Sequence, residues 1–339
     1  GELSTAGLVY AAAPHLQERN TVHKCPRVTL YRGTRIMRRR PRKGGGGSQA
    51  PTIKYLVDER LGQGANGAYE ALQLLRSQAQ RAVKAGDGAK AQQISKEGAL
   101  ALFSRGYADS GAEMAMQLVE VYSSQDVSLD YETSIAAIIE IDRAMAGSTL
   151  PDGEPPVVER VRFLKAALSW SADVNEIGAY TLGDPRIHAL LGASSWAAGD
   201  DVDVGVKHQV LGEVPDELAA ALMNSGCGAL KRDGLACRAV LQFLAVENLR
   251  DAVSFLATFR SLVETDSRYT LFSALIIETC QHDAAAEFQE LTQTWAGLIE
   301  RDPANKTAIR IVGQKFFGIQ PPQDMMSAML SMLAPPASS

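Results

Sequence analysis

The chain has 339 residues, of which 46% are hydrophobic and 22% are charged. This composition is typical of a globular protein and excludes a fibrous or largely disordered chain. The net charge of −5 hides an asymmetry, because residues 1–50 carry 10 Lys and Arg against 2 Asp and Glu, whereas the remainder carries 24 against 37. An acidic body argues against nonspecific nucleic-acid binding, which depends on accumulated Lys and Arg.

Cysteine usage favours a reducing compartment, and we expect the cytosol. No CxxC spacing occurs, and the cysteines are too few for a disulfide framework: Cys25, Cys227, Cys237 and Cys280. No apolar run approaches the roughly 20 residues that a membrane-spanning helix needs. The longest candidates, such as Leu271 to Ile277, have the length of a helix core. We therefore predict neither membrane insertion nor secretion.

Residues 1–50 form a basic head that we exclude from the fold. It contains RGTRIMRRRPRK and ends near GGGGS, and its charge and weak apolar periodicity are typical of a disordered extension. As alternatives, the head could be a fusion segment or a transit peptide. Its basic cluster at Arg38 to Lys43 could be a nuclear-localisation or anion-binding patch.

A glycine pattern follows at Gly62 to Gly67, where GQGANG matches GxGxxG. Such glycines hold a pyrophosphate when they join a strand to a helix, and Ala82-Val83-Lys84 also permits a kinase interpretation on paper. The residues after Gly67 have helical spacing instead, and neither HRD nor DFG occurs. We therefore predict a turn between two helices, with no nucleotide cofactor.

The stretch from Asp87 to Ser124 predicts two helices separated by a turn at Gly106 to Asp109. Each has one apolar stripe that needs a neighbour, such as Ala91, Ile94 and Leu102 in the first helix. The same helix, turn, helix unit recurs downstream. We predict an all-α fold, an α-solenoid of about 13–15 helices stacked as antiparallel hairpins in a tetratricopeptide-like superhelix, with no strand.

Apolar periodicity and capping signals place the later helices. Asp184 is expected to cap a helix that begins at Pro185 and ends at Gly199, and residues 148–156 read as a loop. The remaining helices are expected at Asp130–Arg143, Val157–Trp170, Val202–Leu211, Pro215–Asn224, Leu235–Val246, Leu249–Val263, Tyr269–Gln281, Ala284–Arg301 and Asn305–Gly318. Residues 51–322 form one solenoid, divided into halves 51–200 and 201–322, and a Met-rich tail at 323–339 either folds back on the last helices or docks on a partner.

No pattern in the sequence predicts catalysis or a metal site. The five histidines are far apart and form no HExxH, and no serine lies in a GxSxG elbow. His188 and Cys237 lie among apolar helix neighbours and are expected to be buried structural residues. We predict that the protein is not an enzyme.

Charged residues on two helices predict a docking surface instead. Arg76, Arg81 and Lys84 cluster on one helix, and Glu113 and Glu120 are two turns apart on the face of another. An ordinary solvated face is the alternative. Rim charges of both signs would give a partner steering and register.

Several blocks together resemble the Golgi-to-ER-traffic protein four family, whose members include the 35 kDa subunit of the transmembrane-recognition complex. They follow one another in order across about residues 60–322: GALALFS at 98–104 with Gly106, RVRF at 160–163 leading to ALSWS at 167–171, LGDPRIH at 182–188, AVLQFL at 239–244, and GQKFFGI at 313–319 followed by Pro321-Pro322. The resemblance implies a right-handed helical solenoid without catalytic activity.

The resemblance also implies a role in the guided-entry pathway for tail-anchored membrane proteins. The N-terminal half would dock the pathway's targeting ATPase, and the C-terminal half a ubiquitin-like adaptor or its large chaperone-like counterpart, which recruits a tetratricopeptide co-chaperone. By position, the family's basic anchors fall near Arg76, Arg81 and Lys84, and its ATPase-tuning acidic patch on Glu113 and Glu120. The segment from Arg260 to Thr270 is shorter than the family's usual β-hairpin insertion. A helical scaffold from another assembly, proteasome-lid-like or vesicle-coat, is the alternative.

Overall fold

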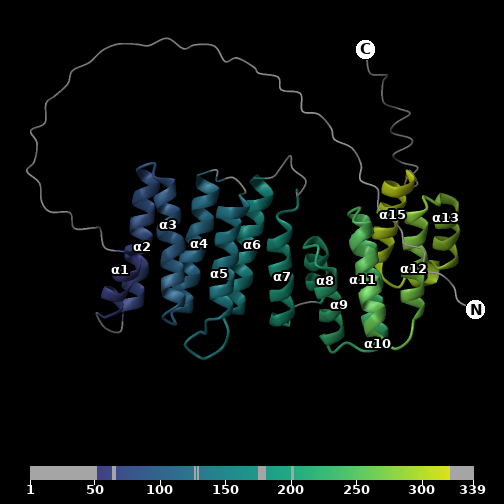
Figure 1. The fold of residues 1–339 in the computed structure, drawn as a ribbon, viewed down its shortest axis with the longest axis horizontal. Coiled ribbons are helices and arrows are strands. Elements are labelled where there is room, and N and C mark those ends of the chain that lie inside the picture. The colour runs from purple at the N-terminus through teal and green to yellow at the C-terminus, as the bar shows by residue number, and fades with distance from the viewer. Residues whose placement is uncertain are drawn as a thin grey trace, which may run out of the picture. The chain divides into compact units, whose positions relative to one another are not determined.

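A computed structural model describes residues 52–62, 66–125, 127, 130–174, 181–199 and 202–320. Within these ranges it is all-helical, without a strand (Figure 1). The first helices are α1 (Ile53–Leu61), α2 (Gly67–Lys84), α3 (Gly88–Phe103), α4 (Ala108–Ser124), a π-helical turn η1 (Tyr131–Ile135) that leads into α5 (Ala136–Ala146), α6 (Val157–Val174) and α7 (Pro185–Ala198). The later ones are α8 (Val202–Leu211), α9 (Pro215–Asn224), α10 (Ala229–Ala245), α11 (Leu249–Leu262), α12 (Arg268–Gln281), α13 (Ala285–Thr294), α14 (Ala296–Ile299) and α15 (Pro303–Phe317).

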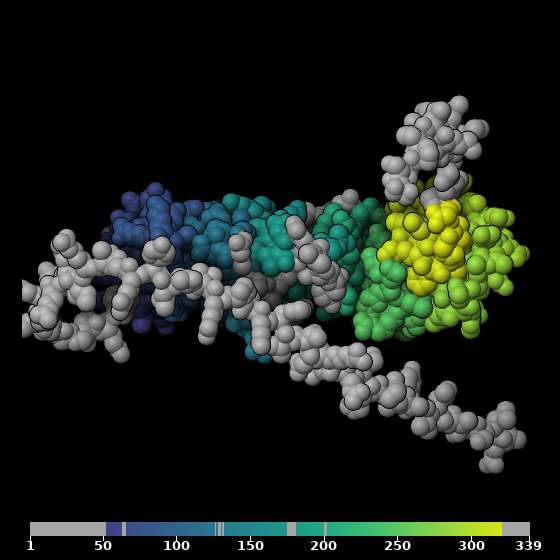
Figure 2. All heavy atoms as spheres, turned by 90° about the horizontal axis from the view of Figure 1, so that it is seen from above, coloured from purple at the N-terminus to yellow at the C-terminus, as the bar shows by residue number. Residues whose placement is uncertain are grey.

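The helices stack as the sequence predicts, in antiparallel hairpins. Each helix from α1 to α7 packs against the next and against the next but one, so that α2, α4 and α6 form one layer and α1, α3, α5 and α7 the other. The last helices are less regular, and α15 returns to pack on α10. Figure 2 shows the yellow residues of α15 against green segments that precede them in the chain. The predicted α-solenoid is confirmed.

Two hydrophobic clusters lie along this stack. The first contains buried residues from Val57 to Leu191, and the second contains buried residues from Val206 to Val312. Large side chains fill both; Trp170 and Phe163 are among the largest in the first, and Phe243 and Phe255 in the second. The gap between the clusters falls within α7, because Leu191 belongs to the first cluster and Trp196 packs against the second.

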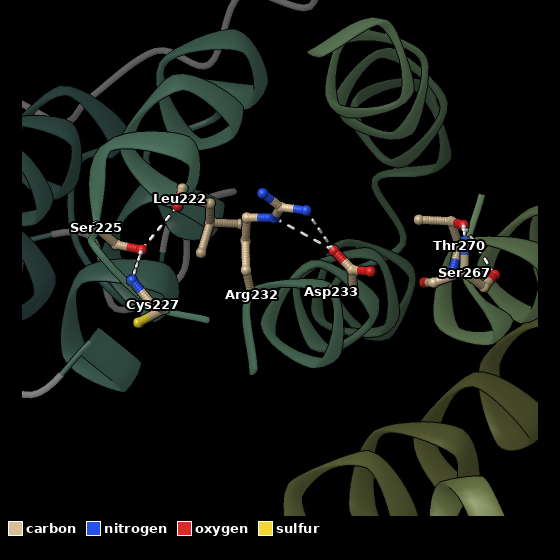
Figure 3. Close-up of polar contacts among 7 residues, drawn as sticks. All are labelled: Leu222, Ser225, Cys227, Arg232, Asp233, Ser267 and Thr270. Carbon is tan, nitrogen blue, oxygen red and sulfur yellow. Dashed lines mark hydrogen bonds and ion pairs between the residues drawn. The ribbon is translucent and has the colours of Figure 1, made fainter. Parts of the chain in front are cut away.

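Local capping chemistry sets the ends of several helices where the sequence predicts them. The Asp184 carboxylate accepts from the backbone N–H of Arg186, Pro185 is the first residue of α7, and Gly199 ends it at a left-handed φ of 65°. Ser267 and Thr270 form a reciprocal capping box at the start of α12 (Figure 3). Such caps satisfy backbone groups that a helix leaves unpaired. The signals at Asp184, Pro185 and Gly199 were predicted, whereas the box at Ser267 was not.

The glycine-rich segment also lies between two helices, as predicted. Helix α1 ends at Leu61 and α2 begins at Gly67, and a Cβ atom at Gly67 would lie 2.6 Å from the Arg60 carbonyl oxygen. Gly67 is therefore required by a close backbone approach between α1 and α2. Residues 63–65 lie outside the described part of the chain.

Several predicted boundaries differ from the structure. Helix α6 runs to Val174 and not to Trp170, and α15 begins at Pro303 and not at Asn305. Helix α10 begins at Ala229 and not at Leu235. The sequence did not show this start, because the first turn of α10 is exposed and has no apolar periodicity. The helix expected at Ala284–Arg301 breaks at Trp295, whose backbone (φ −100°, ψ 15°) ends α13 while its ring packs against Phe272. The segment after Asp130 begins as a π-helical turn.

Several ion pairs have a buried or mostly buried member, and most of these pairs connect two helices. Arg160 of α6 donates two hydrogen bonds to Asp142 of α5, at 2.6 and 2.8 Å, and Asp142 is only 2% exposed. In the C-terminal part, Arg238 of α10 joins Asp203 of α8 to Asp302, the N-cap of α15. Arg232 and Asp233 pair side by side at the start of α10 (Figure 3).

Helices α7 and α8 are in close contact through glycines. A Cβ atom at Gly192 would lie 2.6 Å from Cγ of Gln209, and one at Gly205 would lie 2.8 Å from the Trp196 ring. The Trp196 Nε1–H donates to Gln209 Oε1 at 2.6 Å across the same contact. Small residues thus let the last helix of the first cluster approach the first helix of the second.

Candidate partner-binding surface

The three predicted basic residues of α2 point in two directions. Arg76 is half-buried and turned toward α4, whereas Arg81 and Lys84 are exposed near the end of α2. At 3.6 residues per turn, Arg76 and Arg81 are about 140° apart around the helix. Within the described part of the chain, neither Arg81 nor Lys84 has an ion-pair partner.

Glu113 of α4 lies between two arginines. Its carboxylate is 3.4 Å from Arg76 Nη1 and 3.1 Å from Arg162 Nη1 of α6. The three side chains therefore form a row across α2, α4 and α6. The structure brings one predicted basic anchor and one predicted acidic residue into direct contact, and the pair belongs to a three-residue network.

Arg81 lines a hollow of about 800 Å³ between α1, α2 and α3. Ile53, Leu56 and Ile94 contribute apolar surface to it, and Asp87 and Glu97 contribute carboxylates. Lys90 is a second cation there. A guanidinium over partly apolar surface suits a partner side chain that is both charged and aliphatic.

Glu120 lies in a separate groove between α4 and α6. This groove has a volume of about 520 Å³, and Met116, Trp170 and Asp173 also line it. Glu120 and Asp173 are both exposed, and neither has an ion-pair partner in the described ranges. Glu113 and Glu120 thus lie on one face of α4, as predicted, but only Glu120 is unpaired.

Four charged side chains that have no ion-pair partner among the described residues lie toward the same end of the helices. Helices α2, α4 and α6 run in the same direction, so their last turns lie together at the upper end in Figure 1. Gln125 follows α4 and lies next to Gly88, the first residue of α3. A Cβ atom added to Gly88 would lie 3.2 Å from Oε1 of Gln125. Arg81, Lys84, Glu120 and Asp173 therefore all lie near this end of the helices, which we call the upper surface of the first cluster.

The helix dipole has opposite effects on the cations and the carboxylates near these helix ends. Cations at a helix C-terminus are favourable, so Arg81 and Lys84 stabilise α2. Carboxylates at that end are unfavourable by about 0.3–1 kcal/mol. Asp173 occupies the last turn of α6, so helix stability does not explain its presence, and Glu120 lies just before the last turn of α4.

Sequence reasoning missed Arg162 and Asp173. Both lie on α6, where Arg162, Ala166, Ser169 and Asp173 follow one another at helical spacing along the face that meets α4. That spacing was the available signal. What the sequence could not show is that this face of α6 lies against α4.

The wall of the groove contains a buried polar group without a partner. Trp170 is 2% exposed and its Nε1–H has no acceptor in the described part of the chain. Its ring packs 4.8 Å from that of Tyr122, whose burial raises the pKa of the phenol to about 12. Both rings belong to the core beneath the groove.

The two histidines at the α7–α8 contact form a neutral pair. His188 Nε2 is 3.0 Å from the Leu182 carbonyl oxygen, to which it donates, so His188 Nδ1 accepts from His208 Nδ1–H at 2.8 Å. Burial lowers the pKa of His208 to about 4 and also lowers the pKa of His188. His188 is 3% exposed, which confirms the predicted structural histidine.

The described residues contain no group of His, Cys, Asp or Glu that could hold a metal ion. Cys237 is buried, as predicted, and burial raises the pKa of its thiol to about 12, which leaves it unreactive. None of the helices described is both long and apolar enough to cross a membrane.

Comparison with known proteins identifies relatives along most of the chain. It is 26% identical over 297 residues to Protein GET4 of Arabidopsis thaliana, a match that covers 78% of this chain and 91% of the relative. It is also 26% identical over 267 residues to the Golgi to ER traffic protein 4 homolog of Homo sapiens, with coverage of 75% and 77%.

A solved structure agrees with the fold. The crystal structure of C. therm. Get4 superposes with a TM-score of 0.66 at 26% identity, and the match covers 84% of this chain and 95% of that one. The family model described as Golgi to ER traffic protein 4 matches residues 70–334. The chain therefore belongs to the Golgi to ER traffic protein 4 family.

Proposed function

We propose that this protein is a non-catalytic scaffold in the post-translational insertion of tail-anchored membrane proteins into the ER. It acts in the cytosol and bridges the targeting ATPase to a ubiquitin-like adaptor or its large chaperone-like counterpart, through which a tetratricopeptide co-chaperone joins. The names of the relatives support a role in Golgi-to-ER traffic. The bridging role rests on the resemblance and on the upper surface of the first cluster.

One observation carries the proposed ATPase dock. Arg81 and Lys84 are exposed and unpaired at the same end of the stack as the unpaired carboxylates of Glu120 and Asp173, within the part of the chain that is described. Charges of both signs on one surface would orient a partner and reject a wrong register. We assign Arg81 and Lys84 as anchors and Glu120 as the residue that regulates the ATPase.

Arg76 and Glu113 have a second role in this proposal. Glu113 pairs with both Arg76 and Arg162, so the three side chains bridge α2, α4 and α6 with a net charge of +1 in the free protein. A partner would have to break or share these ion pairs to use them. The exposed pair, Arg81 and Lys84, is therefore the first contact.

The gap between the two hydrophobic clusters supports separate roles for the halves 51–200 and 201–322. The first cluster ends at Leu191 and the second begins at Val206, close to the division proposed from sequence. Under this proposal the first half binds the ATPase and the second the adaptor. By favouring one conformer of the ATPase, the scaffold would restrain hydrolysis until a client arrives.

The test is a titration of the full chain against the targeting ATPase, with and without ATP, at low and high salt. We expect ATP-dependent binding that weakens as salt rises and is lost in the variant R81E/K84E. The variant K306E/R310E is the control, because it makes the same charge change at exposed residues of α15. Absence of binding by the unaltered chain in both nucleotide states would overturn the assignment.

A further inference from the structure

A groove between α12 and α13 lies at one end of the helical stack. Its volume is about 390 Å³, and half-buried Leu275, Ala284 and Leu291 give it an apolar floor. Glu278, His282 and Glu287 lie around it and are exposed. In a stacked helical fold the terminal unit needs a cap, because no further repeat covers its inner face.

We propose that the Met-rich segment of this chain, Met325 to Leu333, folds back as an amphipathic helix and occupies this groove. Helical spacing puts Met326, Met329, Leu330 and Leu333 on one stripe, with Ser327 and Ser331 away from it. Met side chains adapt to irregular apolar gaps, which suits a groove with a shallow floor.

The place where the described chain ends argues for this occupant. Helix α15 finishes beside the start of α13, where the rings of Phe317 and Phe288 are 4.6 Å apart. Phe288 comes one turn after Ala284 and lies about 60° around α13 from Leu291, and both of these residues line the groove. The end of α15 therefore lies next to the wall of the groove. The five peptide steps from Gln320 to Met325 span up to about 17 Å.

The near absence of charge in residues 323–339 is consistent with binding to the groove through apolar side chains. Residues 323–339 contain a single charged residue, Asp324, and no Lys or Arg. The segment therefore offers no cation to Glu278 and Glu287 at the rim, and its Met and Leu side chains must supply the binding. A basic partner segment would use those carboxylates instead, so the two occupants differ in their response to charge.

Two variants of the full chain with matched charge changes test the proposal. M329E/L330E places two carboxylates on the apolar stripe, whereas S327E/S331E places two on the other face. We expect hydrogen exchange of the amides in residues 275–291 to accelerate by about tenfold or more in M329E/L330E, as expected from losing two buried side chains. S327E/S331E should exchange like the unaltered chain. Equal exchange in all three would overturn the proposal.

A crosslinking experiment identifies the occupant. A photo-reactive residue at position 329 should crosslink to α12 or α13 of the same chain. Mixing ¹⁴N- and ¹⁵N-labelled protein separates this from contact between two copies, because only the latter gives mixed-label products. Mixed-label crosslinks at the groove, or crosslinks confined to other helices, would overturn the proposal. Neither experiment involves the targeting ATPase, so both are independent of the proposed function.

Discussion

Arg76 and Glu113 form an ion pair between α2 and α4, with Arg76 Nη1 3.4 Å from the carboxylate. Sequence reasoning assigned the two residues to opposite functions, one as an anchor and one as a regulator. In the structure they pair with each other, and Glu113 is shared with Arg162, so the three side chains keep a net charge of +1. The charges available to a partner are consequently fewer than the sequence suggests.

This relationship predicts the behaviour of Glu113→Gln. The change frees Arg76 and Arg162, so association with the proposed ATPase partner should become faster at low salt and the gain should vanish at high salt. The free energy of unfolding should change by less than about 1 kcal/mol, because the pairs are partly exposed. Stopped-flow association and urea titration measure the two effects. Slower association than in the unaltered chain would contradict the network.

Asp142→Asn should destabilise the protein by about 2–3 kcal/mol, because it leaves the mostly buried Arg160 guanidinium without its carboxylate. Glu140→Gln, on the same helix, is the matched control. Its pair with Lys96 is exposed, so its loss should cost less than about 1 kcal/mol. Urea denaturation of both variants measures the difference, and equal midpoints would refute the assigned difference in burial energy.

Gly192→Val should weaken the contact between α7 and α8. Its Cβ would overlap Gln209, and we expect a loss of about 1–3 kcal/mol from overpacking. Because this contact joins the two hydrophobic clusters, unfolding should also become less cooperative, with separate transitions in calorimetry. Gly297→Ala is the control, since nothing lies within 4 Å of its added Cβ. A single unchanged transition in Gly192→Val would show that the clusters do not depend on this contact.

The His188–His208 pair predicts a pH dependence of stability. Both pKa values are lowered in the folded chain, that of His208 to about 4, so between pH 6.5 and about 4 the unfolded chain binds more protons than the folded one. The stability contribution is complete above pH 6.5 and is lost as the pH falls toward 4. Lys207 and Lys165 oppose the charged form of His208, whereas Asp184 favours that of His188.

His208→Gln should therefore flatten the dependence of the urea midpoint on pH across this window. Gln cannot take up a proton, so its linkage to pH disappears. His282→Gln, at an exposed position after α12, is the control and should keep the slope of the unaltered chain. A slope that persists unchanged in His208→Gln would assign the effect to other groups.

Much of the fold was predictable because helix signals are local. Pro215 and Asn224 bound a helix where the sequence predicts one, and Asp184, Pro185 and Gly199 cap α7 as expected. Caps and apolar periods depend on neighbours within one turn, and the sequence displays these directly. The start of α10 was missed because its exposed first turn has no apolar period.

The candidate surface was only half predictable. The types and spacing of Arg76, Arg81, Glu113 and Glu120 were visible, but their pairing was not. Whether a charge is free or neutralised depends on which helix face packs beside it, and that is a long-range property. Asp173 is more than 50 residues from Glu120 in sequence and still lines the same groove.

The sequence by itself determined that this chain is a stack of helical hairpins, because each apolar stripe needs a neighbour and short turns supply one. It also determined the family, through ordered blocks spread along the chain. Only the tertiary structure decided that Glu113 is occupied while Glu120 is free, and that His188 meets His208. Those outcomes depend on the rotation of each helix about its axis, which packing of the whole core sets and no local pattern encodes.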